Sequence, residues 1–401
     1  MKQQKTVGFI LRRVDCNDGV ASHCETLIRG LIANGWRVVM ITGPVYYDSA
    51  SITRFEALKH LVEDWVIFDQ INPLLPSLSC LLKIQETIKR YEILLLHSHG
   101  YSMLAVCRIF YFFNKLNCVA TFHPSIHGDD PKALKTVVAH QKLRQYKLYL
   151  TVFPPKLFIA YSSDIKNFLN QDLGFPESKI CKTLLGIDTD YFRPPTPEER
   201  QKAREKFGLQ QDDTACVLVG RLNWNKGHDV LIEAARQART ELPHTNLKCL
   251  FAGSGAQEKQ IKEYALVSEE DKHCFVFLGY IDDLREVYWA ADIFVLPSRS
   301  EGLPLVVVEA MCCGVVPIRT PAGGAKDQIE DGINGFVFPL DDSETLAMRL
   351  KLLASNIEFR KQLSTEAQKT ARQKFTVERM VLDTIAVYEE ILNPAKSSLM
   401  Q

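Results

Sequence analysis

Two glutamates stand in an otherwise apolar segment that runs from Ser300 to Met311. Pro304 suits the first position of a helix, where its missing N–H costs nothing, and Gly314 suits the position just past the helix end. Glu301 would then lie in the loop before the helix, and Glu309 within it. The unpaired N–H groups of such a loop and first turn form a natural phosphate site.

A glutamate among valine, alanine and methionine side chains is costly to bury without a partner. The residues alone leave two interpretations of Glu309 open. Either a ligand rich in hydroxyls and phosphates supplies the partner, or a structural lysine or arginine does.

A second segment offers two cations after a short apolar run. The pattern predicts a strand that ends at Gly220 and Arg221, followed by a loop that carries Lys226. Arginine presents a planar fork of donors and lysine a point charge, so the pair suits a diphosphate.

Three more apolar runs end in turns of the same kind, and the last leads directly into Glu301: Phe251–Gly255, Val276–Tyr280 and Asp292–Ser298. In this order the segments resemble the C-terminal half of the retaining GT-B glycosyltransferases of glycosyltransferase family 4. They match its G-R-x-x-x-x-K-G, G-x-G, F-x-G-x, P-S-x-x-E-G and E-x7-E signatures. The loop Pro321–Gly324 and the turn Asp331–Val337 extend the resemblance.

The resemblance implies an α/β fold of the GT-B type, with two Rossmann-like domains that face each other across a cleft. It also implies a nucleotide-sugar donor held chiefly by the second domain. Arg221 and Lys226 would neutralise the diphosphate, Glu309 would accept hydrogen bonds from the ribose, and Glu301 would accept one from a sugar hydroxyl. The other expected donor contacts are Gly220, Gly253, Tyr280, Ile281, Leu284, Gly302, Leu303, Pro304 and Leu305.

In the N-terminal half, histidines stand at the ends of two expected strands, in His97-Ser98-His99 and in Thr121-Phe122-His123. A zinc site is possible in principle, but no fourth ligand at a fitting spacing is evident. The resemblance assigns His123 to the donor sugar and so completes a catalytic set with Arg221, Lys226 and Glu301. Gly19 is expected to approach a phosphate, although the family usually has Gly-Gly where this chain has Asp-Gly.

The chain of 401 residues is long enough for two domains. Residues 6–190 alternate short apolar runs with amphipathic segments, which is typical of a parallel α/β sheet. We expect residues 1–190 plus 377–401 to form an N-terminal acceptor-side domain and residues 191–376 the nucleotide-sugar-binding domain. A last helix, about Val377 to Leu392, would return to the first domain. The strands expected in the first domain are Val7–Leu11, Arg37–Thr42, Ile93–His97, Cys118–Thr121 and Leu157–Tyr161.

The bulk composition excludes several classes of protein. Lys plus Arg and Asp plus Glu both number 48, which gives no indication of a nucleic-acid partner. Eleven cysteines without a C-x-x-C pair argue against a disulfide framework and suit a reducing cytosol. The N-terminal apolar run is too short for a signal peptide, so we expect a cytoplasmic location.

No carboxylate pair of the D-x-D kind lies where a divalent metal would bridge the diphosphate. Asp282-Asp283 and Asp341-Asp342 are interpreted as solvated turn pairs. The expectation is therefore transfer without a metal or other cofactor.

The stretch Pro131–Ser163 contains no acidic residue, and its basic residues alternate with apolar ones. Such a segment is either a solvated helix face or a surface that docks on the inner face of an anionic cell membrane. Its basic residues include Lys132, Lys135, Lys142, Arg144 and Lys147.

The function expected from these observations is retaining, metal-independent transfer of a sugar from UDP-glucose or another UDP-hexose. The acceptor would be a polysaccharide or a lipid-linked glycan. Two alternatives stay open: an isomerase similar to the UDP-sugar 2-epimerases, and a non-catalytic nucleotide-sugar-binding protein. Product analysis without an acceptor distinguishes the first alternative, and donor binding without turnover would support the second.

Overall fold

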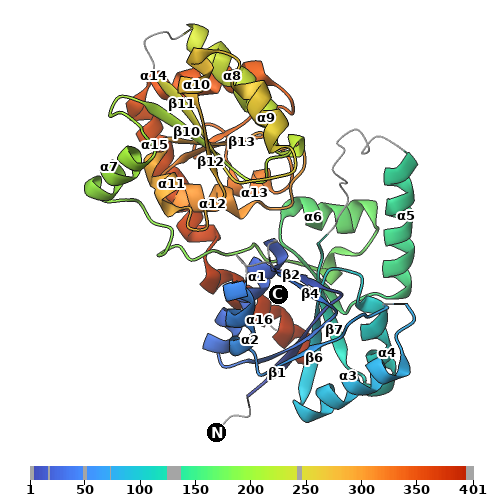
Figure 1. Cartoon of the computed structure of the whole chain (residues 1–401). Coiled ribbons are helices and arrows are strands. Elements are labelled where there is room, and N and C mark those ends of the chain that lie inside the picture. The colour runs from blue at the N-terminus through green and yellow to red at the C-terminus, as the bar shows by residue number, and fades with distance from the viewer. Residues whose placement is uncertain are drawn as a thin grey trace. The chain divides into compact units, whose positions relative to one another are not determined.

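The computed structural model describes residues 4–16, 19–47, 52–72, 74–123, 137–241 and 246–393, with the backbone alone for 137–143 and 146. These residues form two compact units (Figure 1). One contains the described residues up to 123, together with 137–186 and 377–393. The other contains the described residues between 187 and 376. Each unit is described by itself below.

The first unit is built on a parallel sheet of seven strands in the order β5-β3-β1-β6-β7-β8-β9. The strands are β1 (Thr6–Leu11), β3 (Arg37–Thr42), β5 (Asp64–Ile67), β6 (Ile93–His99), β7 (Asn117–Thr121), β8 (Leu157–Ala160) and β9 (Ile180–Lys182). All five expected strands are present with small differences at their ends, whereas β5 and β9 were not expected. A separate short pair joins β2 (Val14–Asp15) to β4 (Val45–Tyr46).

The connections between these strands are helical, as a parallel sheet requires. The helices are α1 (Gly19–Ala33), α2 (Ile52–Leu61), α3 (Leu78–Arg90), α4 (Leu104–Asn114), α5 (Val137–Val152) and α6 (Ser163–Asn167), the last continued by a π-helical turn at Phe168–Asp172. All six residues of β1 are buried, because helices cover both faces of a parallel sheet.

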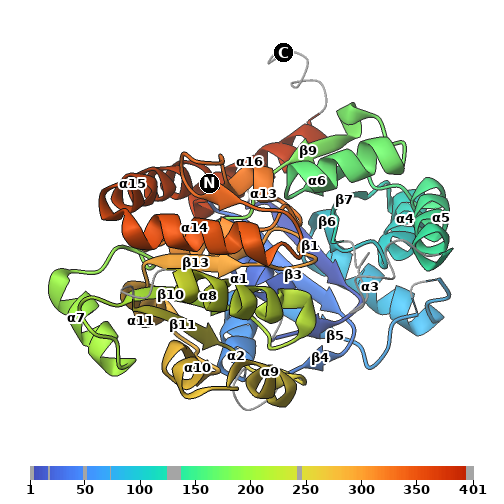
Figure 2. The same ribbon diagram turned by 90° about the horizontal axis from the view of Figure 1, so that it is seen from above.

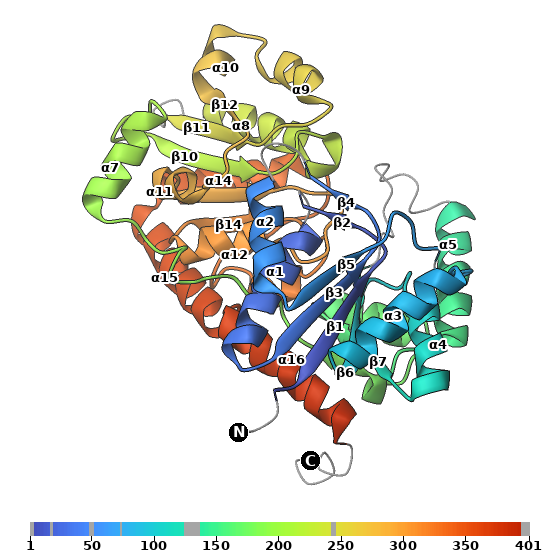
Figure 3. The ribbon, with the colours of Figure 1, turned by 60° about the horizontal axis from the view of Figure 1, so that its bottom comes forward.

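The last helix, α16 (Val377–Leu392), has the predicted bounds and packs against α1 in the first unit, as Figure 3 shows. A side chain at Gly30 of α1 would clash with Val381 of α16, so the glycine permits the close approach of the two helices. The hydroxyl of the buried Tyr388 also forms a hydrogen bond of 2.6 Å with His97 Nδ1. The C-terminal segment is therefore part of the core of the first unit.

The second unit contains a six-stranded parallel sheet in the order β12-β11-β10-β13-β14-β15. Its strands are β10 (Thr214–Val219), β11 (Leu247–Ala252), β12 (Phe275–Gly279), β13 (Ile293–Leu296), β14 (Val316–Arg319) and β15 (Phe336–Val337). Its helices are α7 (Pro197–Lys206), α8 (His228–Glu241), α9 (Glu258–Ala265), α10 (Glu269–Cys274), α11 (Arg285–Ala290), α12 (Leu305–Cys312), α13 (Ala325–Gln328), α14 (Ser343–Ser355) and α15 (Ile357–Lys374). In this unit α8 and α14 lie side by side (Figure 2).

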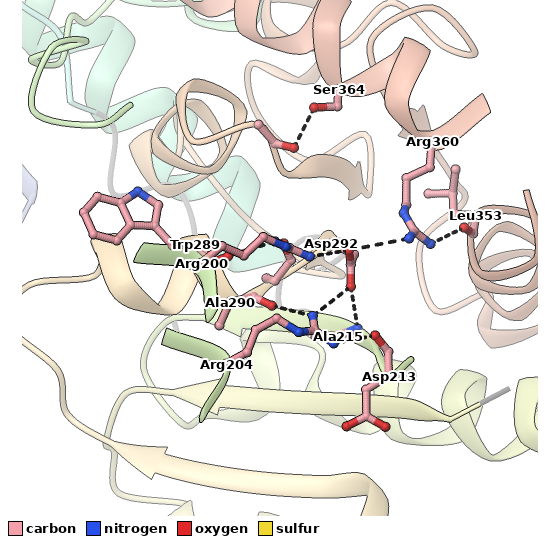
Figure 4. Close-up of polar contacts among 12 residues, drawn as sticks. Arg200, Arg204, Asp213, Ala215, Trp289, Ala290, Asp292, Leu353, Arg360 and Ser364 are labelled. Atoms are coloured by element: carbon pink, nitrogen blue, oxygen red, sulfur yellow. Dashed lines mark hydrogen bonds and ion pairs between the residues drawn. The ribbon is translucent and has the colours of Figure 1, made fainter. Parts of the chain in front are cut away.

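Asp292, just before β13, is the centre of a largely buried ion network (Figure 4). Its carboxylate accepts from Arg200 Nη2 at 2.8 Å and from the backbone N of Ala215 at 2.9 Å. Arg204 and Arg360 each lie 3.5 Å from the same carboxylate. The network ties α7, β10 and α15 to the strand that leads to Glu301.

Among the described residues, no helix combines the length and the apolarity that crossing a membrane requires. All eleven cysteines are free thiols.

Candidate active site

Three loops of the second unit meet at the carboxyl ends of β10, β11 and β13. Gly253 has φ +142°, and a Cβ there would clash with the carbonyl oxygen of Gly220. Gly227 has φ +72°, and its Cβ would clash with the carbonyl oxygen of Pro297. The glycines of the sequence signatures therefore allow backbone segments far apart in the sequence to touch.

Lys226 and Glu301, which belong to two separate motifs, form an ion pair. Lys226 Nζ lies 2.6 Å from Glu301 Oε1, and the two side chains are 20% and 10% exposed. Arg221 is exposed at the start of the same loop. The structure thus brings a lysine and a carboxylate together in the second unit, and the exposed Arg221 lies on the same loop as the lysine.

Arg299 holds the loop that carries Lys226, a role that the sequence did not suggest. Its guanidinium forms a bidentate pair with Asp229, at 2.6 and 3.0 Å, and also donates to the backbone carbonyl of Trp224. Nε donates to Asp341 Oδ1 at 2.6 Å. An arginine two residues before Glu301 was the available signal, but its partners become neighbours only in the folded chain.

The loop before α12 rests on the Gly323-Gly324 turn. A Cβ at Gly323 would clash with the backbone of Glu301, and one at Gly324 with the side chain of Leu303. The fully buried Arg319 donates to the carbonyl of Gly323 at 2.8 Å and also to the side chain of Gln328. The loop of Gly302, Leu303 and Pro304 is thereby supported from beneath.

The sequence had indicated that Pro304 is the first residue of the helix, and this prediction was wrong. Pro304 is the N-cap, with φ −70° and ψ 112°, and α12 begins at Leu305. The φ of proline suits both positions, so the sequence could not separate them. Gln328 Nε2 donates to the Pro304 carbonyl at 2.9 Å and holds it in the extended conformation. Gly314 lies past the helix end with φ +84°, as predicted.

Glu309 lies on α12 and is only partly exposed. Its Oε2 accepts a hydrogen bond of 2.8 Å from the hydroxyl of Tyr288, so the partner in the structure is neither a lysine nor an arginine. Burial raises the pKa of Glu309 to about 7, although the Tyr288 hydroxyl opposes the shift. A hydroxyl already occupies one lone pair of this carboxylate, and further hydroxyl groups are its natural ligands.

The segment after β12 lies at the surface of the second unit. Tyr280 is 65% exposed, and Ile281 and Leu284 are half-buried. The two aspartate pairs are at the surface, as expected, but several of their carboxylates are engaged. Asp283 pairs with Arg285, Asp341 with Arg299, and Asp342 caps α14.

The first unit has a cavity of about 590 Å³ at the carboxyl ends of β1, β6 and β7. Its lining includes Arg12, Arg13, Tyr46, His99 and His123. His97, in contrast, is a core residue, since its two ring nitrogens bond to Tyr388 and to Thr121 Oγ1, at 2.6 and 2.7 Å. Gly19 begins α1, and a Cβ there would meet nothing within 4 Å, so packing alone does not require that glycine.

Two parallel Rossmann-like sheets and a C-terminal helix that contacts the N-terminal one define a GT-B protein. The family described as "Glycosyltransferase Family 4" matches residues 17–191, and "Glycosyl transferases group 1" matches residues 199–370. The chain belongs to this family of nucleotide-sugar glycosyltransferases.

Relatives include the putative glycosyltransferase EpsD of Bacillus subtilis, 34% identical over 255 residues, which cover 62% of this chain and 66% of EpsD. The uncharacterized glycosyltransferase MJ1607 of Methanocaldococcus jannaschii is 26% identical over 92% of this chain and 94% of its own length. The chain therefore spans about two thirds of EpsD and nearly all of the archaeal protein. The crystal structure of Anabaena HepE in complex with UDP has a TM-score of 0.78 at 21% identity and covers 96% of this chain and 100% of HepE.

Proposed function

We propose that this protein is a retaining, metal-independent hexosyltransferase that uses UDP-glucose or another UDP-hexose. The observation that carries the proposal is the Lys226–Glu301 pair, with the exposed Arg221 on the same loop as Lys226. A crystal structure of HepE contains UDP-glucose, which supports this choice of donor.

In the proposed mechanism the two cations bind the diphosphate. Negative charge grows on the diphosphate as the sugar leaves, so Arg221 and Lys226 stabilise the transition state more than the ground state. When Lys226 turns to the diphosphate, its ion pair with Glu301 weakens, and Glu301 accepts a hydrogen bond from a sugar hydroxyl. Glu309 accepts hydrogen bonds from the ribose, while the backbone of Gly302–Leu305 meets the sugar and phosphate.

Several expected roles stay predictions from the family resemblance. They are the contact of His123 with the sugar, the approach of Gly19 to a phosphate, and the contact of Tyr280, Ile281 and Leu284 with the base. Retention of stereochemistry by same-face attack is likewise part of the proposal.

The cavity of the first unit is our candidate for the acceptor site. Arg12 and Arg13 offer charge-assisted donors to an anionic glycan or a lipid-linked phosphate, and Tyr46 and Tyr101 offer rings against which a sugar can pack. We therefore propose a polysaccharide or lipid-linked glycan as the acceptor.

Exposed apolar side chains near the basic segment support docking on a membrane. Leu148 of α5 is 69% exposed, Phe113 of α4 is 82% exposed, and Arg144 and Lys147 are exposed on α5. The hydroxyl of Tyr149 bonds to the backbone of Ala105 and so joins α5 to α4. Lys132 and Lys135 lie outside the described residues, as does the side chain of Lys142. We propose that this surface, called the α4–α5 face, binds the inner face of an anionic membrane.

The diphosphate clamp tests the proposal. Arg221→Ala and Lys226→Ala should each lower kcat/KM by roughly 10²–10³, the usual effect of removing one charge-stabilising donor. Lys259→Ala is the control, because Lys259 is an exposed lysine on α9 of the same unit. Activity of both clamp variants within a few-fold of the control would remove the clamp from the mechanism.

The same assay in EDTA tests metal independence. Transfer should persist, since the cations replace a metal as the charge partner of the diphosphate. If EDTA stops turnover and Mg²⁺ or Mn²⁺ restores it, transfer depends on a metal. Product analysis without an acceptor should show unchanged UDP-hexose, whereas an isomerised sugar would favour the epimerase alternative.

A further inference from the structure

Three histidines of the first unit converge at one point. They are His23 on α1, His99 at the end of β6 and His123 just after β7. Each offers a ring nitrogen, and the three nitrogens lie within 4.8 Å of one another. Among the residues that the structure describes, this is the one group of three or more such side chains close enough to hold a metal ion together.

The histidine nitrogens at this point lack protein partners. His23 Nδ1, both ring nitrogens of His99 and His123 Nε2 are buried and make no hydrogen bond. His97 is the internal contrast, because it lies beside His99 and both of its nitrogens are bonded. One unsatisfied buried polar group costs about 1–3 kcal/mol, so four such nitrogens on three neighbouring rings indicate a ligand that bonds to one nitrogen of each ring.

The protonation state also suits a metal. Burial lowers the pKa of His23 to about 4 and that of His123 to about 3, and it holds that of His99 well below its usual range. Neutral imidazole is the form of histidine that binds metal ions. His99 and His123 also line the cavity of about 590 Å³, which leaves room for water or another ligand at a fourth position.

We propose that His23, His99 and His123 bind one divalent transition-metal ion of the kind that prefers imidazole, with Zn²⁺ as the reference. Three histidines and an open fourth position form a known arrangement for this ion, at Zn–N distances of about 2.0–2.1 Å. In tetrahedral coordination such distances place the nitrogens about 3.3 Å apart, so the rings must move inward from the present arrangement, in which the nitrogens lie within 4.8 Å of one another.

The site has a consequence for catalysis. A metal would occupy the ring nitrogen of His123 and prevent it from bonding to a sugar, so the metal should inhibit transfer. This consequence rests on the proposed function, whereas metal binding itself does not. The metal proposed here regulates the enzyme and is not required for transfer.

The test titrates the metal-free full chain with Co²⁺ and follows the visible absorption of the bound ion, then displaces it with Zn²⁺. We expect one tight site per chain. His23→Gln, His99→Gln and His123→Gln should each weaken binding by at least roughly 100-fold, because loss of a ligand costs more than the roughly 10–100-fold that loss of an outer-shell partner costs. The partly exposed His123 provides the variant that best tolerates substitution.

Two control variants separate this site from histidines in general. His60→Gln changes an exposed histidine of α2, and His228→Gln changes a lone buried histidine of the second unit whose Nε2 is also unpaired. Both should bind the metal as the unchanged protein does. Binding that is absent, or equally strong in the three site variants, would overturn the proposal and leave water as the partner of these nitrogens.

Activity measured in the same samples distinguishes the two proposals. Metal binding without inhibition would support the histidine site and contradict the role of His123 in transfer. Normal transfer without metal binding would overturn the histidine site and leave the proposed function intact.

Discussion

At the scale of single residues, Glu309 shows how the fold changes the pKa of a carboxylate. The hydroxyl of Tyr288 bonds to its carboxylate at 2.8 Å, and burial raises its pKa from 4.5 to about 7. The group thus titrates near neutral pH. Its carboxylate form accepts stronger hydrogen bonds from hydroxyl donors than its neutral form does.

We therefore predict that the affinity for UDP-glucose falls as pH decreases from 8.5 to 5.5, by roughly tenfold, because a charge-assisted hydrogen bond is about twice as strong as a neutral one. Glu309→Gln should bind more weakly at pH 8.5 and show little dependence on pH. Calorimetry measures the affinity for UDP-glucose at each pH. UDP-glucose is preferable to UDP, because the terminal phosphate of UDP is a monoester that itself titrates near pH 6. Parallel pH profiles for the two proteins would exclude Glu309 as the titrating group.

The stability of the free protein should change in the opposite direction. Between pH 4.5 and 7 the folded state retains a proton on Glu309 that the unfolded chain has lost. The contribution of this group to stability is therefore complete below pH 4.5 and decreases as pH rises to about 7.

At the scale of elements, the loops after β10 and β13 are held together by backbone contact. Gly227 follows the short 3-10 turn Trp224–Lys226 of the loop after β10, and it touches Pro297 of the loop after β13. Arg299, also on the loop after β13, pairs with Asp229 at the start of α8. The position of Lys226 relative to Glu301 depends on the contact between Gly227 and Pro297.

A pair of glycine substitutions tests this contact. Gly227 and Gly208 both lie in the second unit with nearly the same φ, +72° and +68°, but a Cβ at Gly208 would meet nothing within 4 Å. Gly208→Ala should cost about 1 kcal/mol, the strain of a left-handed backbone alone. Gly227→Ala should cost clearly more, because the Pro297 carbonyl must also move. Equal midpoints of urea unfolding for the two variants would show that the loops are not held by this contact.

At the scale of the whole molecule, the total charge is balanced, with 48 basic and 48 acidic residues. The distribution along the chain is not, because residues 131–163 include no acidic residue. The exposed α5 residues Arg144, Lys147 and Leu148 add a described surface to that pattern. Cations that surround apolar side chains favour adsorption on anionic lipid.

Reversal of Lys142, Arg144 and Lys147 to Glu should therefore release the protein from phosphatidylglycerol vesicles in cosedimentation. Each basic residue near the surface contributes about 1 kcal/mol, so the triple variant should lose at least roughly 100-fold in affinity. Reversal of the exposed Lys259 and Lys272 in the second unit is the control. Wild-type protein that stays in the supernatant at low salt would show that the α4–α5 face is merely solvated.

Local patterns in the sequence were sufficient for most elements of the fold. Strand β3 and helix α16 have the predicted bounds, because a buried apolar run and an amphipathic repeat are properties of neighbouring residues. The short strands β5 and β9 were missed, since a few residues carry too little periodicity. Glu301 and Glu309 also lie in the loop and the helix where the sequence placed them.

Tertiary structure alone decided which of these residues meet. Lys226 pairs with Glu301, which lies 75 residues further along the chain, and Glu309 accepts a hydrogen bond from Tyr288. His23 lies close to His99 and His123. Of the two partners that the sequence left open for Glu309, the structure contains no lysine or arginine but the hydroxyl of Tyr288. The sequence had not placed His23 with the other histidines. The lysine–glutamate and histidine contacts form because parallel strands bring their carboxyl ends to one edge of a sheet, and that edge gathers residues which have no regular spacing along the chain. Glu309 and Tyr288 meet because their helices, α12 and α11, belong to the same folded unit.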